Sequence, residues 1–531
     1  MSRRLALTAI VLLTIVAGLP RPTSVRAQSV AAAPVAGFSD PDRRSKLATA
    51  FADIDRMFAD FAKGTHVPGA AWGIVIDGEL AHLGAAGVRD VRTNAAVDSD
   101  TVFRIASMTK SFTAVAILKL RDEGRLSLDD PAERYVPELK DLRYPTTDSP
   151  RITIRHLLSH SEGFPEDNPW GDQQLSKSDE DLSRMLRGGI PFSNPPGIAY
   201  EYSNYGFAIL GRIVSRVSGK PYDEYVSANI LQPLGMTSTT LHPSKVPANR
   251  MAIGYRWEDE RWKEEPALPH GSFGSMGGML TSIRDLSRYV AMFLDAWPPH
   301  DGPETAPLRR ASLREMQQPW RPSGVRVARD GATGATQLTA SAYAFGLGVT
   351  QTCDYRAVVA HSGGLPGYGS LMRWLPDYGV GIIAFGNLTY TGWGRVAGDA
   401  IDRLAKSGGL QPRAVRPSAD LVAARTAVSK LIVQWDDALA DRIAAENLFL
   451  DRSRDRRRKE LDELRAKVGA CSPSDQFDIV ENALRGQWTM SCERGKLQVA
   501  ITLAPTTPPT VQFMAVRPAP AEPQRPSTCT Q

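Results

Sequence analysis

Strand-forming segments lie at both ends of one long region, residues 38–410, and this placement constrains the fold more than any other feature. Near its start, two apolar runs flank Asp77-Gly78, a dipeptide typical of a two-residue hairpin turn. Near its end, four further runs have strand character, at residues 343–350, 357–361, 369–375 and 379–385. Helices and loops dominate between them. The sequence therefore predicts an α/β (α+β) fold, in which one antiparallel sheet is built from both ends and flanked by helices and a helical insert.

Apolar residues at helical spacing predict four long helices around this sheet. They cover residues 40–61, 205–218, 282–294 and 394–406. Residues 295–340, by contrast, are rich in proline and glycine, which favour turns over regular structure. We expect that stretch to be an irregular connection.

A second, smaller domain is expected after a proline-containing linker at residues 411–417. Residues 418–520 begin with helical patterns and continue with four strand-like segments, which predicts an accessory α+β domain. Cys471 and Cys492 bracket its first hairpin, and we expect them to form a disulfide. The pairing of Cys353 and Cys529 stays open, and residues 521–531 are expected to be a tail.

Residues 1–27 have the pattern of a secretion signal. Arg3 and Arg4 precede an apolar run at residues 5–19, and Val25-Arg-Ala27 offers a cleavage site with small residues. The run is shorter than the ~20 residues that span a bilayer, so we expect no stable membrane span after cleavage. An uncleaved anchor is the alternative. The four cysteines suit an oxidising compartment, so the mature protein is expected in a periplasm or outside the cell.

The overall charge gives no reason to expect nucleic acid as a partner. The formal net charge is +5, but four arginines and no acid lie in residues 1–27. Removal of that segment lowers the formal charge by these four arginines, to +1. A chain so close to neutral lacks the basic surface that attracts phosphate backbones.

Ser107 and Lys110 form the only Ser-x-x-Lys sequence in the chain. Residues three apart on a helix are neighbours on one surface, so a hydroxyl and an amine at this spacing can share a proton. A serine at a helix start also lies near unpaired backbone N–H groups, which can stabilise the oxyanion of an attacked carbonyl. The same residues also fit an N-capped helix with a solvated lysine in its first turn. The motif alone does not decide between the two.

Two further motifs supply what an acyl-transfer serine needs. Tyr202-Ser-Asn204 is the only Tyr-x-Asn sequence, and it lies on a tight loop before a predicted helix. His361-Ser-Gly363-Gly364 lies at the end of a predicted strand. Tyrosine and lysine have ordinary pKa values near ~10 and ~10.4, too high for a base at neutral pH. We expect the ammonium of Lys110 to lower the pKa of Tyr202 by contact in a partly buried cleft.

Ser107-x-x-Lys110, Tyr202-Ser-Asn204 and His361-Ser-Gly363, in this order, resemble the three motifs of the β-lactamase-related serine hydrolases. That superfamily contains class C β-lactamases, D-alanyl-D-alanine carboxypeptidases, D-aminopeptidases and lipase-like esterases. The resemblance covers roughly residues 40–408 and does not include the accessory domain. It implies a β-lactamase/transpeptidase-like sheet flanked by helices.

The resemblance also implies a role for each matching residue. Ser107 is expected to be the nucleophile that forms an acyl-enzyme, with Lys110 and Tyr202 as the base system. Asn204 is expected to position the substrate amide or Lys110. His361, Gly363 and Gly364 are expected to bind substrate. Within that set, the backbone N–H groups of Ser107 and Gly364 would form the oxyanion hole, and Gly363 would let substrate lie close to the strand edge.

The histidine at position 361 departs from the best-known activity of that superfamily. Its β-lactamases usually carry a lysine there, which helps to bind a substrate carboxylate, whereas histidine is mostly neutral at pH 7. Two other sequences match the same pattern, but His82-Leu-Gly84 precedes the nucleophile and Lys406-Ser-Gly408 closes a predicted helix. We therefore expect an exported hydrolase of esters or D-amino-acid peptides or amides. A slow β-lactamase, or a non-hydrolytic sensor that binds penicillin or peptidoglycan, is the alternative.

No metal or cofactor is expected. His156 and His160 have the i, i+4 spacing of a metal-binding pair, but neither the glutamate of a zinc protease nor a third ligand is evident in the sequence. A structural role is the better interpretation of the pair. The expected partner is a small-molecule ester, amide or peptide, with peptidoglycan as a further candidate. Four aromatic residues near the motifs either line the cleft or pack in the core, namely Trp170, Tyr205, Tyr368 and Trp393.

Overall fold

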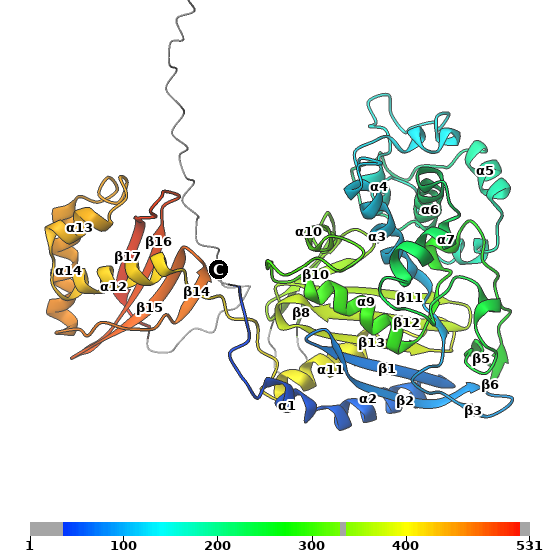
Figure 1. Cartoon of the computed structure of the whole chain (residues 1–531), viewed down its shortest axis with the longest axis horizontal. Helices are drawn as coiled ribbons and strands as arrows, with labels where there is room; N and C mark the ends of the chain where they lie inside the picture. The colour runs from blue at the N-terminus through cyan, green and yellow to red at the C-terminus, as the bar shows by residue number, and fades with distance from the viewer. Residues whose placement is uncertain (1–34, 330–335, 521–531) are drawn as a thin grey trace, which may run out of the picture.

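A nine-stranded antiparallel sheet forms the centre of the main domain (Figure 1). The computed structural model describes residues 35–329 and 336–520. The strand order is β3-β2-β1-β13-β12-β11-β10-β9-β8. The N-terminal strand β1 (Gly69–Ile76) pairs with β13 (Val380–Gly386), so the two ends of the domain meet in the middle of the sheet. This arrangement confirms the predicted fold class.

The remaining strands of the sheet are β2 (Glu79–Asp90), β3 (Ala95–Ala96), β8 (Arg321–Arg329), β9 (Thr336–Tyr343), β10 (Gly348–Thr352), β11 (Val358–Leu365) and β12 (Tyr368–Leu375). Two short ribbons lie outside it: β4 (Phe103–Arg104) pairs with β7 (Leu280–Thr281), and β5 (Tyr255–Glu258) pairs with β6 (Arg261–Glu264).

β11 pairs with β10 only between Val358–Ala360 and Gly348–Thr350. Its edge from His361 onward therefore has no strand partner on that side among the described residues.

One face of the sheet is covered by α1 (Arg43–Ala48), α2 (Phe51–Gly64) and α11 (Gly394–Lys406). Aromatic rings hold this layer together. The ring of Phe58 stacks on Trp72 at 5.4 Å between centroids and on Trp393 at 6.0 Å. All three side chains are at most 2% exposed, so this face is a packed core.

The other face carries α9 (Ile283–Asp295) and the predicted helical insert. The insert is built around α3 (Thr109–Asp122), α6 (Asn204–Ser218) and α8 (Gly274–Gly277), which pack on one another. Phe112 of α3 stacks on Tyr289 of α9 with ring centroids 3.8 Å apart. The smaller helices are α4 (Ile154–Leu158), α5 (Asp179–Arg187), α7 (Tyr222–Val226) and α10 (Arg310–Glu315).

The structure corrects three sequence predictions. Residues 295–340 are not an irregular connection, because they contain α10, the edge strand β8 and the start of β9. β8 escaped prediction because almost all of its residues are exposed, so no buried face marks it. The helix expected at residues 40–61 is divided at Thr49-Ala50 into α1 and α2. The strand expected at residues 343–350 is interrupted, because residues 344–347 form a turn between the end of β9 and the start of β10.

The C-terminal residues form a separate hydrophobic core. α12 (Ala419–Val433), α13 (Asp437–Ile443) and α14 (Arg454–Val468) precede an antiparallel sheet of order β14-β15-β16-β17. Its strands are β14 (Ile479–Asn482), β15 (Arg485–Cys492), β16 (Gly495–Leu503) and β17 (Val511–Pro518). A disulfide joins Cys471 to Cys492. In the expected linker, Ala414 pairs with Gly37 as an isolated bridge.

Some sequence predictions lie outside the described residues. They are the secretion signal at residues 1–27 and the tail at 521–531, which contains Cys529. Within residues 35–329 and 336–520, no helix combines the length and the apolar character that crossing a membrane requires.

Candidate active site

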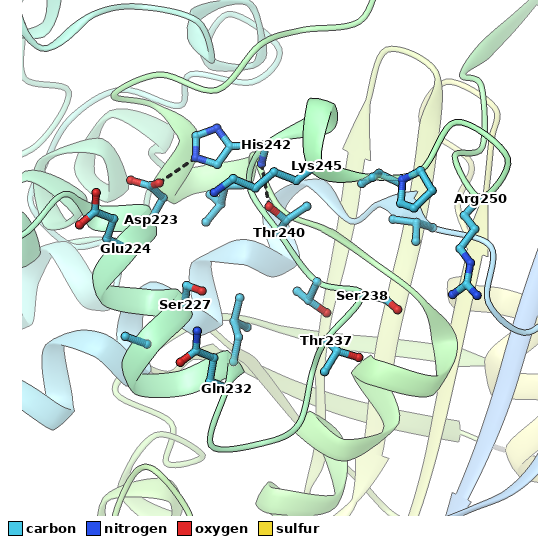
Figure 2. Close-up of a pocket in the computed structure, with 17 residues that line it drawn as sticks. Asp223, Glu224, Ser227, Gln232, Thr237, Ser238, Thr240, His242, Lys245 and Arg250 are labelled. Atoms are coloured by element: carbon cyan, nitrogen blue, oxygen red, sulfur yellow. Dashed lines mark hydrogen bonds and ion pairs between the residues drawn. The ribbon is translucent and has the colours of Figure 1, made fainter.

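Two cavities of similar size are candidate sites, and only one contains the sequence motifs. The first, of about 650 Å³, lies beside α7 and the loop that follows it (Figure 2). Its most prominent contact joins His242 Nε2 to Asp223 Oδ2 at 2.7 Å. None of the predicted site residues lines it. The second, of about 740 Å³, is lined by Ser107, Tyr202, His361 and Gly364. We call this second cavity the catalytic cleft.

Ser107 lies in the single turn η1 (Ala106–Met108), directly before α3. The turn is held in place by the sheet, because Ser370 Oγ of β12 donates to the carbonyl of Ile105 at 2.8 Å. Ala106 has a φ of 47°, a left-handed conformation that is strained for a residue with a side chain. Strain of this kind is common at nucleophiles and other functional positions.

Gly363 permits the close approach of β11 to this turn. A Cβ atom at position 363 would lie 2.2 Å from the carbonyl oxygen of Ile105 and 3.0 Å from Ala106 Cβ. The absent side chain therefore faces the nucleophile's own backbone rather than substrate, which corrects the role expected for Gly363. Gly364 lines the cleft, and a Cβ atom there would meet the ring of Tyr390 at 2.6 Å.

Lys110 is fully buried behind Ser107. Its Nζ donates to Ser107 Oγ at 3.2 Å, to Asn204 Oδ1 at 2.6 Å and to the carbonyl of Met276 at 2.9 Å. Burial is the main cause that lowers the pKa of Lys110 to about 7, against the opposing effect of Asp167, Asp172 and Glu166. A large part of the population therefore carries a neutral amine at neutral pH, ready to accept the Ser107 proton.

Tyr202 behaves differently from the expectation. Burial raises the pKa of its phenol well above the ordinary value, and the interaction with the Ser107 hydroxyl offsets this only in part. The Lys110 Nζ lies 4.7 Å from the centroid of the Tyr202 ring. The prediction of a lowered Tyr202 pKa is therefore wrong. The two groups divide the work, with Lys110 suited to accept a proton and Tyr202 suited to hold one.

His160 positions the Tyr202 loop. Its Nδ1 accepts the backbone N–H of Ser203 at 3.1 Å, and its ring packs on Tyr202 with centroids 4.4 Å apart. His156 forms a capping box with Thr153 at the start of α4. Both histidines are thus engaged in holding backbone. No group of three or more potential ligands that could hold a metal is found in the described part of the chain.

Asn204 is placed by the N-terminus of α6. Asp167 accepts the backbone N–H groups of Asn204 at 2.7 Å and Tyr205 at 2.8 Å, which satisfies the first donors of the helix. Asn204 Nδ2 donates to Asn168 Oδ1 at 2.7 Å, and this fixes the amide so that Oδ1 faces Lys110. Asn204 therefore contacts Lys110 directly, and positioning of Lys110 is one of the two roles expected for Asn204.

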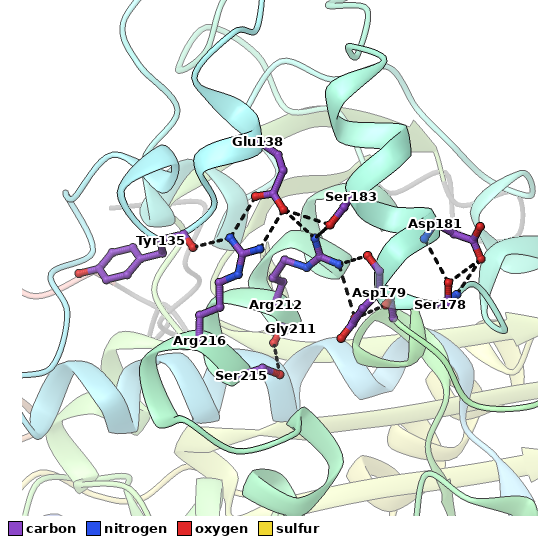
Figure 3. A network of polar contacts seen from close by, with 11 residues as sticks. Tyr135, Glu138, Ser178, Asp179, Asp181, Ser183, Gly211, Arg212, Ser215 and Arg216 are labelled. Carbon is purple, nitrogen blue, oxygen red and sulfur yellow. Dashed lines mark hydrogen bonds and ion pairs between the residues drawn. The ribbon is translucent and has the colours of Figure 1, made fainter.

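A polar network holds the rest of α6 against its neighbours (Figure 3). Glu138 accepts from Arg216 at 2.8 Å and from Arg212 at 3.3 Å, and Arg212 also donates to Ser183 of α5 at 2.6 Å. The hydrogen bond from Arg216 is the main cause that lowers the pKa of Glu138 to about 2. Asn204 thus begins a helix that is fixed at both ends.

His361 is held as a neutral imidazole. Its Nδ1 donates to the carbonyl of Ser362 at 2.6 Å, so its Nε2 accepts the hydroxyl of Tyr343 at 2.9 Å. Burial lowers the pKa of His361 to about 3. The third motif therefore presents no positive charge to the cleft. Tyr343, which contacts the other ring nitrogen, was not singled out by the sequence, because no local signal marks it.

The carboxylic acids and the arginine that line the cleft are Glu166, Asp172 and Arg373. Asp172 is 2% exposed and accepts the hydroxyl of Tyr390 at 2.8 Å. Arg373 on β12 donates to the carbonyl of Gly394 at 3.0 Å, and its Nε is buried without a hydrogen-bond partner. The sequence did not point to Asp172, Tyr390 or Arg373, since each belongs to no recognisable motif.

The other sequence candidates lie elsewhere. His82 of β2 contacts Asp55 at 2.8 Å, and Lys406 is the exposed last residue of α11. Of the four aromatic residues, Trp393 lines the cleft, whereas the hydroxyl of Tyr368 donates to the carbonyl of Ala252. Trp170 and Tyr205 line a smaller cavity next to the cleft.

Comparisons with known proteins agree with this site. A family model described as Beta-lactamase matches residues 54–406. Protein flp of Staphylococcus aureus (strain COL) is 31% identical over 335 residues, which cover 62% of this chain and 61% of that protein. Penicillin-binding protein 4 of Amycolatopsis lactamdurans is 32% identical over 263 residues, which cover 48% of this chain and 66% of that protein. The chain therefore spans less than two thirds of the length of these relatives.

A solved structure shares the fold. It is the octameric penicillin-binding protein homologue from Pyrococcus abyssi, with a TM-score of 0.55 and 21% sequence identity. The match covers 85% of this chain and 96% of that chain. At this level of identity the likeness concerns the architecture alone.

Proposed function

Because the chain belongs to the beta-lactamase family, we propose that it is an exported serine hydrolase that forms an acyl-enzyme on Ser107. The family supports a serine-hydrolase or penicillin-binding type of function. The finer proposal is hydrolysis of an ester or of a D-amino-acid peptide or amide. The observation that carries the acyl-enzyme proposal is the buried Lys110 amine, which lies 3.2 Å from Ser107 Oγ and has its pKa lowered to about 7.

The proposed reaction begins with transfer of the Ser107 proton to neutral Lys110 as Oγ attacks the substrate carbonyl. The backbone N–H groups of Ser107 and Gly364 stabilise the oxyanion. The proton then passes to the leaving alkoxide or amine. Tyr202 is placed to relay it, because its raised pKa keeps the phenol protonated at rest. Water attacks the acyl-enzyme and gives its proton to Lys110. Lys110 then returns this proton to Ser107 Oγ as the acyl bond breaks and the acid leaves.

The charges of the cleft favour substrates without a carboxylate beside the scissile bond. His361 is neutral, and the cleft is lined by two carboxylic acids, Glu166 and Asp172, and one arginine, Arg373. A substrate carboxylate would find no cation at the third motif. An ester or a peptide whose leaving part lacks a carboxylate meets no such penalty. This supports an esterase or aminopeptidase type of activity.

Arg373 supports a second candidate. Its guanidinium lines the same cleft, and no carboxylate among the described residues pairs with it. It is the one lining side chain that would be able to receive the terminal carboxylate of a D-alanyl-D-alanine peptide or of a β-lactam. On this alternative the protein is a carboxypeptidase, a slow β-lactamase or a penicillin-binding sensor. The name of the Amycolatopsis relative describes that protein as penicillin-binding.

One comparison separates these candidates. Turnover of p-nitrophenyl butyrate, a D-alanyl-D-alanine peptide and nitrocefin is measured for the wild type and for Ser107→Ala, with Arg373→Gln as a third protein. We expect ester turnover that disappears in Ser107→Ala and persists in Arg373→Gln. Peptide or nitrocefin turnover that depends on both residues would favour the second candidate. Equal turnover by Ser107→Ala would refute the acyl-enzyme.

Export remains part of the proposal. The signal pattern of residues 1–27 supports it, and the Cys471–Cys492 disulfide suits an oxidising compartment. In a host with a periplasm, we expect the protein in a periplasmic extract, with a new N-terminus after Ala27. Recovery of the full-length chain from the cytoplasm would contradict export. Peptidoglycan remains a further candidate partner, which a pull-down with purified cell wall would test.

A further inference from the structure

A smaller cavity of about 440 Å³ adjoins the catalytic cleft. Its wall is mostly apolar, and the side chains that define it are Phe164, Trp170, Met185, Ile190, Pro191 and Tyr205. None of the three catalytic motifs needs such a cavity for chemistry. We call it the apolar pocket.

One segment separates the apolar pocket from the catalytic cleft. Glu166 lines both cavities. Beyond it, Asn168 and Asp172 line the cleft, whereas Asp167 and Trp170 line the apolar pocket. The two spaces therefore lie on either side of residues 166–172 and share Glu166 in their walls.

The polar atoms in the wall of the pocket are already engaged, with one exception. Asp167 accepts the first N–H groups of α6, and Ser203 Oγ accepts the N–H of Gly206 at 3.0 Å. The hydroxyl of Tyr205 is buried and has no hydrogen-bond partner, although the residue is only 8% exposed. A buried hydroxyl without a partner is costly.

Aromatic rings form one side of the pocket. Trp170 lies parallel to Tyr205, with centroids 6.0 Å apart and an angle of 2° between the planes. Phe164 meets Tyr205 edge-on at 6.1 Å. Trp170 is 46% exposed, which is unusual for so large an apolar side chain and leaves apolar surface available at the rim.

We propose that the apolar pocket is the subsite for an aliphatic or aromatic acyl arm of the substrate. This deepens the proposed function and rests on it, because the arm belongs to the acyl group that Ser107 receives. A cavity of ~150 Å³ can hold benzene, so a pocket of about 440 Å³ has room for a ring with several methylene groups or for a medium-length chain.

The test uses p-nitrophenyl esters of increasing acyl length, from acetate to octanoate. Each methylene that enters an apolar pocket should raise kcat/KM by up to about fourfold, until the pocket is full. Met185→Trp places a large side chain in the pocket. Met57→Trp is the matched control, because Met57 lines a cavity between α2 and α11 that shares no lining residue with either space.

We expect the ratio of kcat/KM for octanoate to that for acetate to fall at least tenfold in Met185→Trp and to stay unchanged in Met57→Trp. An unchanged ratio in a folded Met185→Trp protein would overturn the proposal, as would an equal fall in both variants.

A binding measurement distinguishes failure of this inference from failure of the proposed function. Titration of Ser107→Ala protein with methyl octanoate and with methyl acetate needs no turnover. Tighter binding of the octanoate that is lost on adding Met185→Trp supports the pocket even if no ester is hydrolysed. Equal binding of both esters would show that the apolar pocket does not bind the acyl arm, whether or not Ser107 is active.

Discussion

The amine of Lys110 lies 2.6 Å from Oδ1 of Asn204, a residue 94 positions away in the sequence. The amine also donates to the hydroxyl of Ser107 and to the carbonyl and sulfur of Met276. All of these acceptors are neutral, so no carboxylate among the described residues contacts the buried amine directly, and burial is the main influence on its protonation. Lys110 can therefore serve as the base beside Ser107 although none of its hydrogen-bond partners is a histidine or an acid.

Activity should depend on pH through Lys110. The amine must be neutral to accept the Ser107 proton, and its pKa is lowered to about 7. We therefore expect kcat/KM for a p-nitrophenyl ester to rise as pH increases and to level off above the apparent pKa, near 7. His361 does not contribute to this rise in kcat/KM, because its pKa is about 3. A profile that falls with pH between 6 and 8 would contradict Lys110 as the base.

Stability should also depend on pH through Lys110. The folded pKa is about 7 and the ordinary value is 10.5, so the unfolded chain binds more protons between these limits. The cost of burying the lysine is fully present below pH 7 and fades as pH rises toward 10.5. The difference in free energy of unfolding between Lys110→Met and the wild type should shrink by about 1.4 kcal/mol per pH unit in this window. Urea unfolding at pH 7, 8 and 9 measures it, and a constant difference would show that the lysine is not neutral when buried.

Replacement of His361 should change which substrates react. His361→Lys places a cation where the neutral imidazole now accepts the Tyr343 hydroxyl. We expect acylation by a fluorescent penicillin to accelerate at least tenfold relative to ester hydrolysis. Gln351→Lys is the matched control, since it adds the same charge at an exposed position of β10 that does not line the cleft. Equal acceleration in both variants would show that only the overall charge matters.

Gly363 should not tolerate a side chain. The added Cβ atom of Gly363→Ala would lie 2.2 Å from the Ile105 carbonyl oxygen, so β11 or the nucleophile turn must shift. We expect a loss of ~1–3 kcal/mol in stability and a loss of most activity. Gly64→Ala is the control, because a Cβ atom there meets nothing within 4 Å. Normal stability and activity of Gly363→Ala, measured by thermal unfolding and ester turnover, would disprove the tight approach.

The disulfide should stabilise the accessory domain without affecting catalysis. It links Cys471 to Cys492, which are 21 residues apart, and closing a loop of this size contributes ~3 kcal/mol. In a Cys471→Ser, Cys492→Ser double variant, we expect faster hydrogen exchange across β15 and β16 and unchanged ester turnover. Unchanged exchange would show that the bond adds nothing to the stability of this sheet.

Much of the fold follows from local pattern. Residues 394–406 have apolar positions at helical spacing, and α11 has these bounds. The dipeptide Asp77-Gly78 separates β1 from β2 as its turn chemistry requires. β8 shows where this approach fails, because Val325 and Val327 are 71% and 65% exposed and therefore carry no signal of a buried face. Its position is set by pairing with β9, which is a property of the sheet.

The sequence by itself determined the family, the order of the three motifs and the assembly of one sheet from both ends of the main domain. Those features depend on residue type and spacing along the chain. Only the tertiary structure decided the protonation of the site and the shape of its surroundings. Lys110 meets Met276 across 166 residues, and the apolar pocket combines segments that precede and follow α5. Burial and contact between distant segments set a pKa and form a cavity, and neither can be read from spacing alone.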